Sequence, residues 1–564
     1  MQRINNERGI ALIISLFIIV MLLGFSSVLI LRTVNESNQA RIERESMKAF
    51  FIAESGMHNG LDGLDNLINN LMLNTVNNMN PSTVISKALT NLSDGVQFLY
   101  ETVEDNGNPV LIINGNRAEY TTSSSFGSGS YAYDIIITEK TNPVTVTPDT
   151  WDFPYNYRVE ATGSVQGLAK NVLLSGDFTV RVQRDNFAKY ALFTNRQEMS
   201  GGTNIWFTGK TNFAGPVHTN KRFNIALNPS ATFDGAVTQH EQTARFYNGG
   251  WPVLLDADFN GNSDTPTFNA GFTRGVDPIA LSSSAQQQDM IDQATGGNTY
   301  STDGIYIPNS GGALTGGIYV KGNAEITLSN SGPHQTYIVQ QGSQTIHVTP
   351  DKLTKTTTIW DGASGYTTYN GLPDGVDDVG TIVYVDGGIN SIGGYIVAEE
   401  QATIASDQYI TIEDNVTYVG ATPAVGTPGT PGYVAPHNSD QDNLLGLVSW
   451  NGSVAIGHNA PDNISIHATI LAQNDVVMVE GWSDSGVGPR GTATLLGGAI
   501  SDNYGAFGTF SGSTGALLSG YGRNFVYDQR MAIGNAPPYF PSLNTFIAFT
   551  NDITDKMIWQ ESGL

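Results

Sequence analysis

The sequence predicts an α+β protein: a long N-terminal helix and a small antiparallel sheet, followed by a large all-β domain. The helix is predicted by an uncharged apolar stretch at residues 9–31 that continues into apolar residues at three- and four-residue steps. The β part is predicted by short segments rich in β-branched residues and bounded by Gly, Pro and Asn. A motif repeated within residues 212–239 indicates that the β domain is a right-handed parallel β-helix, or solenoid.

Composition limits the partners and the chemistry of the chain. Its 564 residues include 52 Asp and Glu against 27 Lys and Arg, so the net charge is −25, and there is no Cys. Such acidity excludes nucleic acid and anionic membrane surfaces as preferred partners, because both attract basic patches. The lack of Cys excludes disulfides, thiolate zinc sites and cysteine nucleophiles.

Residues 9–31 are long enough to cross a membrane, since ~20 apolar residues span a bilayer as a helix. A secretory signal peptide would have a shorter apolar region followed by a small-residue cleavage site, and neither is evident. Arg3 and Arg8 precede the stretch, and positive charge tends to stay in the cytoplasm. We therefore expect a single-pass protein with its body outside the cytoplasm.

One amphipathic helical segment is expected over residues 10–80, from the membrane stretch to the Asn-rich run that ends at Pro81. Residues 10–31 form its membrane part. Four glycines argue against an unbroken rod, because glycine is a poor helix former. These glycines are Gly24, Gly56, Gly60 and Gly63.

The N-terminus resembles that of type IV pilin-like proteins, specifically the PilX-type minor pilins. The resemblance is carried by the leader ending in Arg8-Gly9, by the uncharged stretch that starts at Ile10, and by "AFFIAESGM" at residues 49–57. It implies that a prepilin peptidase cuts between Gly9 and Ile10, so that residues 1–9 are a leader. It also implies that the new N-terminus is methylated.

By the same resemblance, the helix packs with other pilin-like subunits, and Ile14 and Glu54 lie in the filament core. Major pilins carry a glutamate at the fifth mature position, where this chain has Ile14. An acid there neutralises the terminal amine of a neighbouring subunit in the apolar core, where an unpaired charge is expensive. Its absence implies a tip, initiating or accessory subunit of a type IV pilus or pseudopilus, which moves from the bacterial inner membrane to the cell surface. The alternatives are an ordinary signal anchor and the major subunit of an unusually thick filament.

A small antiparallel sheet is predicted in a region that spans residues 81–185. Three segments alternate or run apolar with β-branched residues, and these are residues 131–137, 157–165 and 171–183. A helix followed by such a sheet is the arrangement that the pilin resemblance requires. The β-solenoid body is then placed at residues 186–564.

The body is predicted to consist of short stacked strands. The pattern F-x-G-x-V occurs twice at a spacing of 20, which suits one coil of a solenoid. It aligns Phe213 with Phe233, Gly215 with Gly235 and Val217 with Val237. Frequent turns favour a solenoid, and a sandwich or several small β-domains are the alternatives. The C-terminal "PPYFP" and the residues after it are expected to form a strap over the solenoid end.

The body also resembles a bacterial pilin-anchored family that is known only as a domain of unknown function. The resemblance lies in four stretches, residues 205–220, 444–472, 491–510 and 521–541. It implies an architecture and an envelope location, and it assigns no catalytic residue.

The sharpest local motif is "DADFNGNSD" at residues 256–264, which matches the first half of an EF-hand-like calcium loop. Oxygen-bearing side chains alternate along it: Asp256, Asp258, Asn260, Asn262 and Asp264, with Gly261 at the sixth position. The twelfth position is Thr267 rather than Glu, so a bidentate ligand must come from elsewhere or water must fill the gap. Calcium is the one cofactor that we expect, and a polar Asx-rich turn is the alternative.

We expect no enzymatic activity. The sequence contains no G-x-S-x-G, H-E-x-x-H or P-loop pattern. Acids such as Glu400 lie in predicted coils, where some proximity arises by chance, and His218 and His467 lie in strand-like segments that favour a core role. Because many polysaccharide lyases and hydrolases are β-helices, a membrane-anchored carbohydrate-binding or carbohydrate-active protein is the alternative function. If the body is adhesive, surface polysaccharide is the ligand that we expect.

Overall fold

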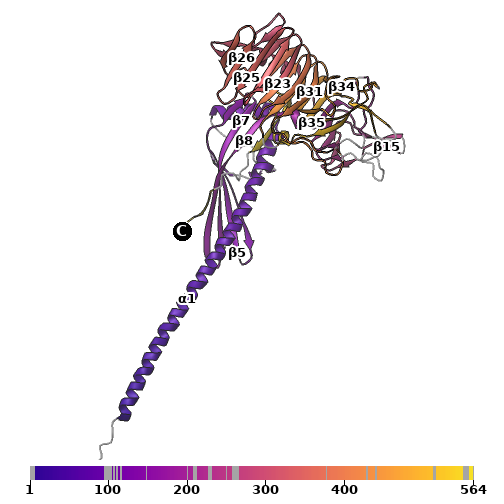
Figure 1. The fold of residues 1–564 in the computed structure, drawn as a ribbon. Helices are drawn as coiled ribbons and strands as arrows, with labels where there is room; N and C mark the ends of the chain where they lie inside the picture. Colours follow the sequence, from indigo (N-terminus) through magenta and orange to yellow (C-terminus); the bar gives the residue numbers. More distant parts are fainter. Residues whose placement is uncertain are drawn as a thin grey trace, which may run out of the picture. The chain divides into compact units, whose positions relative to one another are not determined.

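The computed structural model describes most of the chain, and Figure 1 shows its ribbon. The described residues are 7–94, 104–105, 108–109, 112–114, 117–147, 149–199, 201–207, 212–225, 232–248, 251–256, 266–375, 378–426, 428, 430–438, 441–484, 486–511, 516–550 and 558–562. The chain divides into two compact units. The first comprises Met1–Gln183 and Thr545–Leu564, and the second comprises Arg184–Asn544.

The N-terminal helix α1 (Glu7–Asn66) is continuous for 60 residues and passes through all four glycines. The expectation that glycine interrupts the rod is therefore wrong. The reason is packing: a Cβ on Gly56 would lie 2.9 Å from the Cβ of Tyr131 in the sheet of this unit. Gly60 likewise faces Val159 too closely for a side chain. Close packing against the sheet thus outweighs the weak helix propensity of glycine.

Beyond α1 the chain stays helical up to Asn77, within the predicted helical segment, and a further helix lies where the β region was predicted to begin. The π-helix η1 (Leu67–Leu73), α2 (Asn74–Asn77) and α3 (Pro81–Asp94) follow in turn. Asn80 Oδ1 accepts a hydrogen bond from the backbone N–H of Ser82 at 3.0 Å, as an N-cap does. Pro81 then occupies the first helical position, where its missing N–H costs nothing. The Asn-Pro pair that ends one helix therefore starts another.

A curled antiparallel sheet follows in the first unit, with the strand order β3-β4-β5-β7-β8-β38. Its strands are β3 (Ile112–Asn114), β4 (Arg117–Phe126), β5 (Gly129–Glu139), β7 (Thr150–Val165), β8 (Leu168–Asn186) and β38 (Ser542–Thr550), with β6 (Val144–Thr147) on β7 and β39 (Ile558–Ser562) on β8. A separate pair is formed by β1 (Glu104–Asp105) and β2 (Asn108–Pro109). The three predicted segments lie within β5, β7 and β8 and pair antiparallel, so the predicted sheet is confirmed.

Helix α1 covers one face of this sheet, and Figure 1 shows it running along β5. Along β7, buried and more exposed residues alternate, as the period of a strand with one covered face requires. Trp151 of β7 stacks on Phe546 of β38 with ring centroids 5.7 Å apart. The C-terminal strands therefore contribute to the core of the first unit.

This C-terminal contribution differs from the strap that the sequence analysis placed over the body. The "PPYFP" segment belongs to the second unit and lies against its strand β30 (Gln401–Ser406), where the hydroxyl of Thr403 donates to the carbonyl of Pro538. Strands β38 and β39 instead join the first sheet, where β39 pairs with residues 171–175 of β8.

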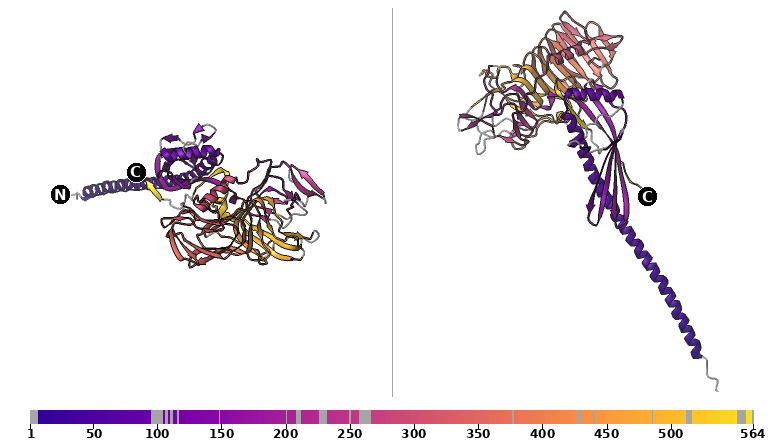
Figure 2. Two further views of the ribbon diagram at one scale, coloured as in Figure 1. Left: turned by 90° about the horizontal axis from the view of Figure 1, so that it is seen from above. Right: turned by 180° about the vertical axis from the view of Figure 1, so that it is seen from behind.

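The second unit consists mostly of short strands, which Figure 2 shows lying one above the other. Its elements are η3 (Phe187–Lys189), β9 (Leu192–Arg196), β10 (Asn212–Phe213), β11 (Val217–Thr219), β12 (Asn224–Ile225), β13 (Thr232–Phe233), β14 (Val237–Gln239), β15 (Ala244–Asn248), β16 (Trp251–Leu255), β17 (Thr267–Phe268), β18 (Phe272–Arg274), α4 (Ser284–Thr295), β19 (Gly304–Tyr306), β20 (Asn309–Ser310), β21 (Ala313–Leu314), β22 (Ile318–Lys321), β23 (Ala324–Ser331), β24 (His334–Gln341), β25 (Gln344–Asp351), β26 (Thr356–Asp361), β27 (Gly365–Asn370), β28 (Thr381–Asp386), β29 (Ile389–Ile396), β30 (Gln401–Ser406), β31 (Ile410–Tyr418), β32 (Leu444–Ser449), β33 (Val454–Ile456), β34 (Ser465–Val479), β35 (Pro489–Tyr504), β36 (Gly508–Phe510), β37 (Leu517–Val526) and η4 (Gln529–Ile533).

The repeated F-x-G-x-V motif pairs in the register that its spacing predicts. Phe213 lies beside Phe233, and Val217 beside Val237, in parallel strands. A third parallel strand continues the stack, since Phe268 of β17 pairs with Phe233. The three rings stack at centroid distances of 5.6 and 5.2 Å. Residues 268–272 read F-N-A-G-F and lack the Gly and Val of the motif at its third and fifth positions, so the sequence pattern does not reveal this third strand.

Amide side chains link successive parallel strands at one edge of the second unit. The Nδ2 of Asn474 donates to Oδ1 of Asn451 at 3.0 Å, and Asn451 donates in turn to Asp407 at 3.0 Å. Asn220 donates to Asn195 in the same manner, also at 3.0 Å. Such ladders hold the turns of neighbouring strands in register.

The second unit is nevertheless not a uniform parallel β-helix. Parallel pairs run through β22, β28, β30, β32, β34 and β35. Antiparallel strands β24 to β27 extend the sheet from β23, and further antiparallel pairs form at β15–β16 and β36–β37. The sheets are therefore mixed and curled, and the expectation of a regular solenoid over residues 186–564 is corrected on this point.

Candidate assembly surface

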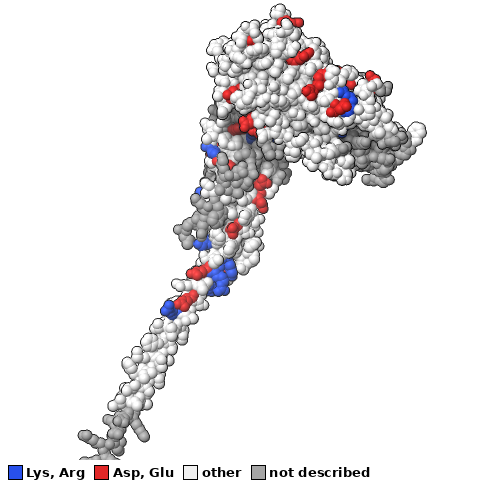
Figure 3. All heavy atoms as spheres, in the orientation of Figure 1, with Lys and Arg blue, Asp and Glu red and all other residues white. Residues whose placement is uncertain are grey.

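The first half of α1 is an apolar surface exposed all the way around the helix. Ile10 is 58% exposed and Ile14 is 54% exposed, although both side chains are purely hydrocarbon. The most apolar window of the helix has a mean hydropathy of 2.8 and is 0% buried. By length and composition, this is a helix that can cross a membrane. Figure 3 shows the same segment as an uncharged rod.

Two serine hydroxyls within this apolar stretch are satisfied inside the helix itself. The hydroxyl of Ser15 donates to the carbonyl of Leu12 at 2.9 Å, and that of Ser27 donates to the carbonyl of Leu23 at 2.8 Å. Such bonds remove the cost of placing a hydroxyl in lipid or in an apolar protein core. The first described ion pair, Arg32 with Glu36 at 2.9 Å, comes only where the apolar stretch ends.

The second half of α1 is docked on the sheet of the first unit. From Glu45 onward one side of the helix is buried, including Ala49 and Ala53, which are both 0% exposed. Gly163 of β7 permits this approach, because a Cβ there would lie 2.9 Å from the Cα of Ala53. The helix therefore has a free apolar half and a half that is fixed by its own subunit.

The predicted processing and core residues divide between these two halves. Gly9 and Ile10 are exposed in the first turns of the described helix, and Ile14 is exposed one turn later. Glu54 is half-buried in the docked half. Within one chain, the structure therefore does not bring Ile14 and Glu54 together.

The predicted calcium loop falls almost wholly outside the described residues. Asp256 is described and exposed, and its backbone carbonyl accepts a hydrogen bond from Nη1 of Arg274 at 3.2 Å. Asp258, Asn260, Asn262 and Asp264 lie outside the described residues. Among the residues that are described, no group of three or more His, Asp or Glu side chains is placed to hold a metal ion. The calcium site stays a prediction.

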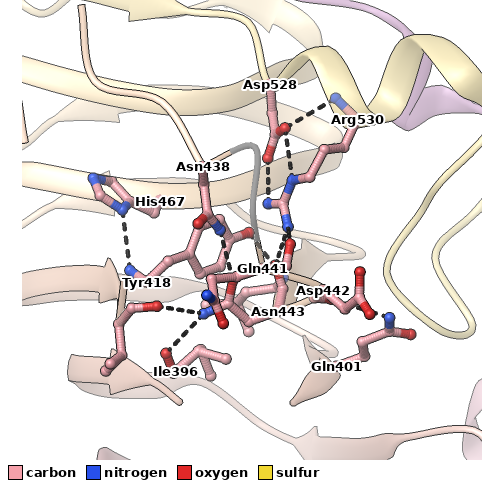
Figure 4. Close-up of polar contacts among 12 residues, drawn as sticks. Ile396, Gln401, Tyr418, Asn438, Gln441, Asp442, Asn443, His467, Asp528 and Arg530 are labelled. Carbon is pink, nitrogen blue, oxygen red and sulfur yellow. Dashed lines mark hydrogen bonds and ion pairs between the residues drawn. The ribbon is translucent and has the colours of Figure 1, made fainter. Parts of the chain in front are cut away.

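A buried ion pair near the end of the second unit was not singled out from the sequence. Figure 4 shows the guanidinium of Arg530 donating two hydrogen bonds to the carboxylate of Asp528, from Nε to Oδ1 at 3.0 Å and from Nη2 to Oδ2 at 2.6 Å. The remaining nitrogen, Nη1, donates to the carbonyls of Gln441 and Asn443. Asp528 is only 3% exposed, so the ion pair is shielded from water. Through Arg530 it connects η4 to the loop that contains Gln441 and Asn443.

His467 lies in the same cluster and has a structural role. The backbone N–H of Tyr418 donates to its Nδ1 at 3.0 Å, which requires that nitrogen to be unprotonated. Burial lowers the pKa of His467 to about 4. Burial also lowers the pKa of His218, whose ring nitrogens bond Thr238 and Asn220. Both residues are therefore neutral histidines that are hydrogen-bonded within the core, as the sequence predicts.

Glu400 is buried and accepts hydrogen bonds from two neighbouring hydroxyls. Its Oε1 accepts from the hydroxyl of Tyr337 at 2.8 Å and from Thr381 at 3.0 Å. Burial raises the pKa of its carboxyl. Its hydrogen bonds join β24 and β28 to the start of β30, so Glu400 has a structural role in holding these strands together.

Comparisons with known proteins find a family model that matches part of the chain and a distantly similar solved structure. The family described as "Domain of unknown function (DUF4900)" matches residues 152–241, which run from β7 into the first parallel strands. No curated protein matches the chain. Among solved structures, the competence-associated pilin ComZ from Thermus thermophilus is similar at 12% identity and a TM-score of 0.31, covering 92% of this chain and 98% of its own. A likeness this distant assigns no function to the chain.

Proposed function

We propose that this chain is a pilin-like structural subunit of a type IV pilus or a related pseudopilus. The observation that carries the proposal is the division of α1 into an exposed apolar half and a half docked on an antiparallel sheet. An apolar helix that leaves its own domain needs lipid or other apolar helices around it. A membrane before assembly and a helical filament core after assembly would both meet that need.

The role proposed is structural rather than catalytic. The helix would anchor the subunit in the inner membrane and then pack among helices of other pilin-like subunits. The second unit, Arg184–Asn544, would be displayed outside the cell as a tip or accessory module. The uncharged Ile14 supports a non-repeating position, because a buried N-terminal amine beside it would lack a neutralising acid.

The N-terminus of the mature protein tests this proposal. We expect mass spectrometry of the native protein from sheared surface filaments to find a chain that begins at a methylated Ile10. The matched variant Gly9→Val should keep the leader and stay in the membrane fraction. An intact Met1 in wild-type protein, confined to the membrane, would contradict the proposal and favour a plain signal anchor.

A further inference from the structure

One face of the antiparallel sheet β23–β27 bears a row of aromatic side chains that are half-buried or exposed. His347 of β25, Trp360 of β26 and Tyr366 of β27 are directly opposed in register, so they form one line across three strands. The rings of His347 and Trp360 are 4.5 Å apart, and Tyr366 is 78% exposed. We call these three residues the aromatic row.

A second line of side chains runs beside the aromatic row on the same face. Thr349, Thr358 and Thr368 are opposed in register, two residues along each strand, and we call them the threonine row. Thr358 and Thr368 share a hydrogen bond at 3.0 Å, and Thr349 shares one with Thr336 at 2.9 Å. These bonds fix the hydroxyl groups in a flat array.

The two rows are not needed for the core of the unit. The opposite face of these strands holds the buried side chains, among them Val348 at 0% and Ile359 at 8% exposure. Tyr366 is exposed and Trp360 is half-buried, so both rings lie on the face opposite the core. Neighbouring aromatic rings on the solvent side of a sheet form an apolar patch of the kind that can serve as a binding site.

We propose that this face binds a neutral polysaccharide. A pyranose ring has an apolar C–H face, which stacks on aromatic rings, and a rim of hydroxyls, which bond with other hydroxyls. The aromatic row supplies the first kind of contact and the threonine row the second. Adjacent strands lie 4.7–4.9 Å apart, so the aromatic row spans about 10 Å, which is of the order of a disaccharide.

Charge selects the class of polymer. Neither row contains Lys, Arg, Asp or Glu, and the whole chain carries a net charge of −25. An anionic polymer would be repelled by the chain and would find no cation on these rows to hold it. The face therefore fits a neutral glycan, whose binding depends on stacking and hydrogen bonds instead of charge. The inference does not depend on the pilin-like assembly proposed above.

A depletion assay tests the inference, with the full chain in detergent and suspended microcrystalline cellulose or chitin as the probe. Wild-type protein should be removed from solution by at least one of these two neutral polymers. Soluble polygalacturonate, which is anionic, should not compete. Salt should weaken the binding little, because no ion pairs are involved.

Variants locate the binding face. Tyr366→Ala and Trp360→Ala should each weaken binding about tenfold, the loss expected for one stacked ring. Trp251→Ala is the matched control, because Trp251 is also exposed, at 77%, but lies on β16. Trp360→Tyr should retain most of the binding, which separates stacking from a fold defect. The inference would be overturned if wild-type protein bound neither polymer, or if Trp251→Ala lost as much binding as the variants of the aromatic row. It would also be overturned if this face bound only other proteins.

Discussion

Gly163 of β7 lies directly beneath Ala53 of α1, so close that a Cβ on the glycine would stand 2.9 Å from the alanine Cα. The Ala49 carbonyl would be contacted as well. This contact sets the distance between the docked half of the helix and its sheet, and it depends on a residue with no side chain.

We therefore expect Gly163→Ala to destabilise the first unit. The added methyl group meets backbone atoms, which cannot rotate away as a side chain can, so a cost of at least ~1–3 kcal/mol is expected. Hydrogen exchange of β5 and β7 amides should become faster in the variant. The control is Gly201→Ala, where a Cβ would meet open space. Unchanged protection of β7 in Gly163→Ala would show that the helix is not packed this closely.

The aromatic stack of the second unit gives a second prediction. Phe233 is 1% exposed and lies between Phe213 and Phe268. Phe233→Ala should lower the free energy of unfolding of this unit by ~3–5 kcal/mol, because it removes a buried ring from between two others. Trp251→Ala, at a site 77% exposed, should change it by less than ~0.5 kcal/mol. Thermal unfolding followed by near-ultraviolet circular dichroism measures both, and equal midpoints would argue against the stacked arrangement.

The pKa of His467 makes the stability of the second unit depend on pH. Burial lowers this pKa to about 4, whereas an unfolded histidine titrates near ~6.5. The unfolded chain therefore binds the proton more tightly, so stability is full above about pH 6.5 and falls as the pH drops toward 4. The total loss from this one residue is ~3 kcal/mol.

His467→Gln should flatten that part of the pH profile, because an amide oxygen can accept the Tyr418 N–H without titrating. Glu400 and Asp374 have raised pKa values and act in the opposite direction, but they are common to both proteins and cancel in the difference. Asp528 and Arg530 also act on His467 in opposite directions, and both stay in place. His458→Gln serves as the surface control. A difference profile without slope between pH 6.5 and 4 would contradict the assigned role.

The calcium loop is a prediction from the sequence alone, and it has a direct test. Wild-type protein dialysed against a chelator should bind calcium in a calorimetric titration. Asp258→Ala and Asp264→Ala should abolish the binding, since each removes an oxygen ligand of the alternating set. Asp289→Ala, on the exposed face of α4, is the control. If calcium released or absorbed no heat on titration into wild-type protein, the result would favour the alternative, a polar Asx-rich turn without a metal.

Local periodicity was enough to predict the helix, the three central strands of the first sheet and the register of the first two repeats. It failed where tertiary contacts decide the outcome. Gly56 and Gly60 were judged by helix propensity, but their sheet contacts keep α1 unbroken. The return of β39 to β8 depends on contacts between residues far apart in sequence, which no local pattern reveals.

Of the two proposed functional surfaces, one could be predicted from local sequence and the other could not. The exposed half of α1 follows from hydropathy alone, whereas processing at Gly9 and Ile10 is expected only from the resemblance to type IV pilin-like proteins. The aromatic row could not be found this way, because His347, Trp360 and Tyr366 come from three strands and align only through antiparallel pairing. A signal was present in "HVTP", "TTTIWD" and "GYTTYN", where aromatic and threonine residues alternate, but the register that joins them is a tertiary fact.

Cross-linking from the exposed half of α1 tests the central claim most directly. Because the chain contains no Cys, Leu22→Cys introduces the only thiol, at a position 59% exposed on this apolar surface. A thiol-specific photo-cross-linker at this site should join the chain to another pilin-like subunit in sheared filaments, whereas the docked control Ala53→Cys should not. If Leu22→Cys cross-links only to lipid and the chain never appears in the filament fraction, the subunit is a membrane anchor and the assembly role is wrong.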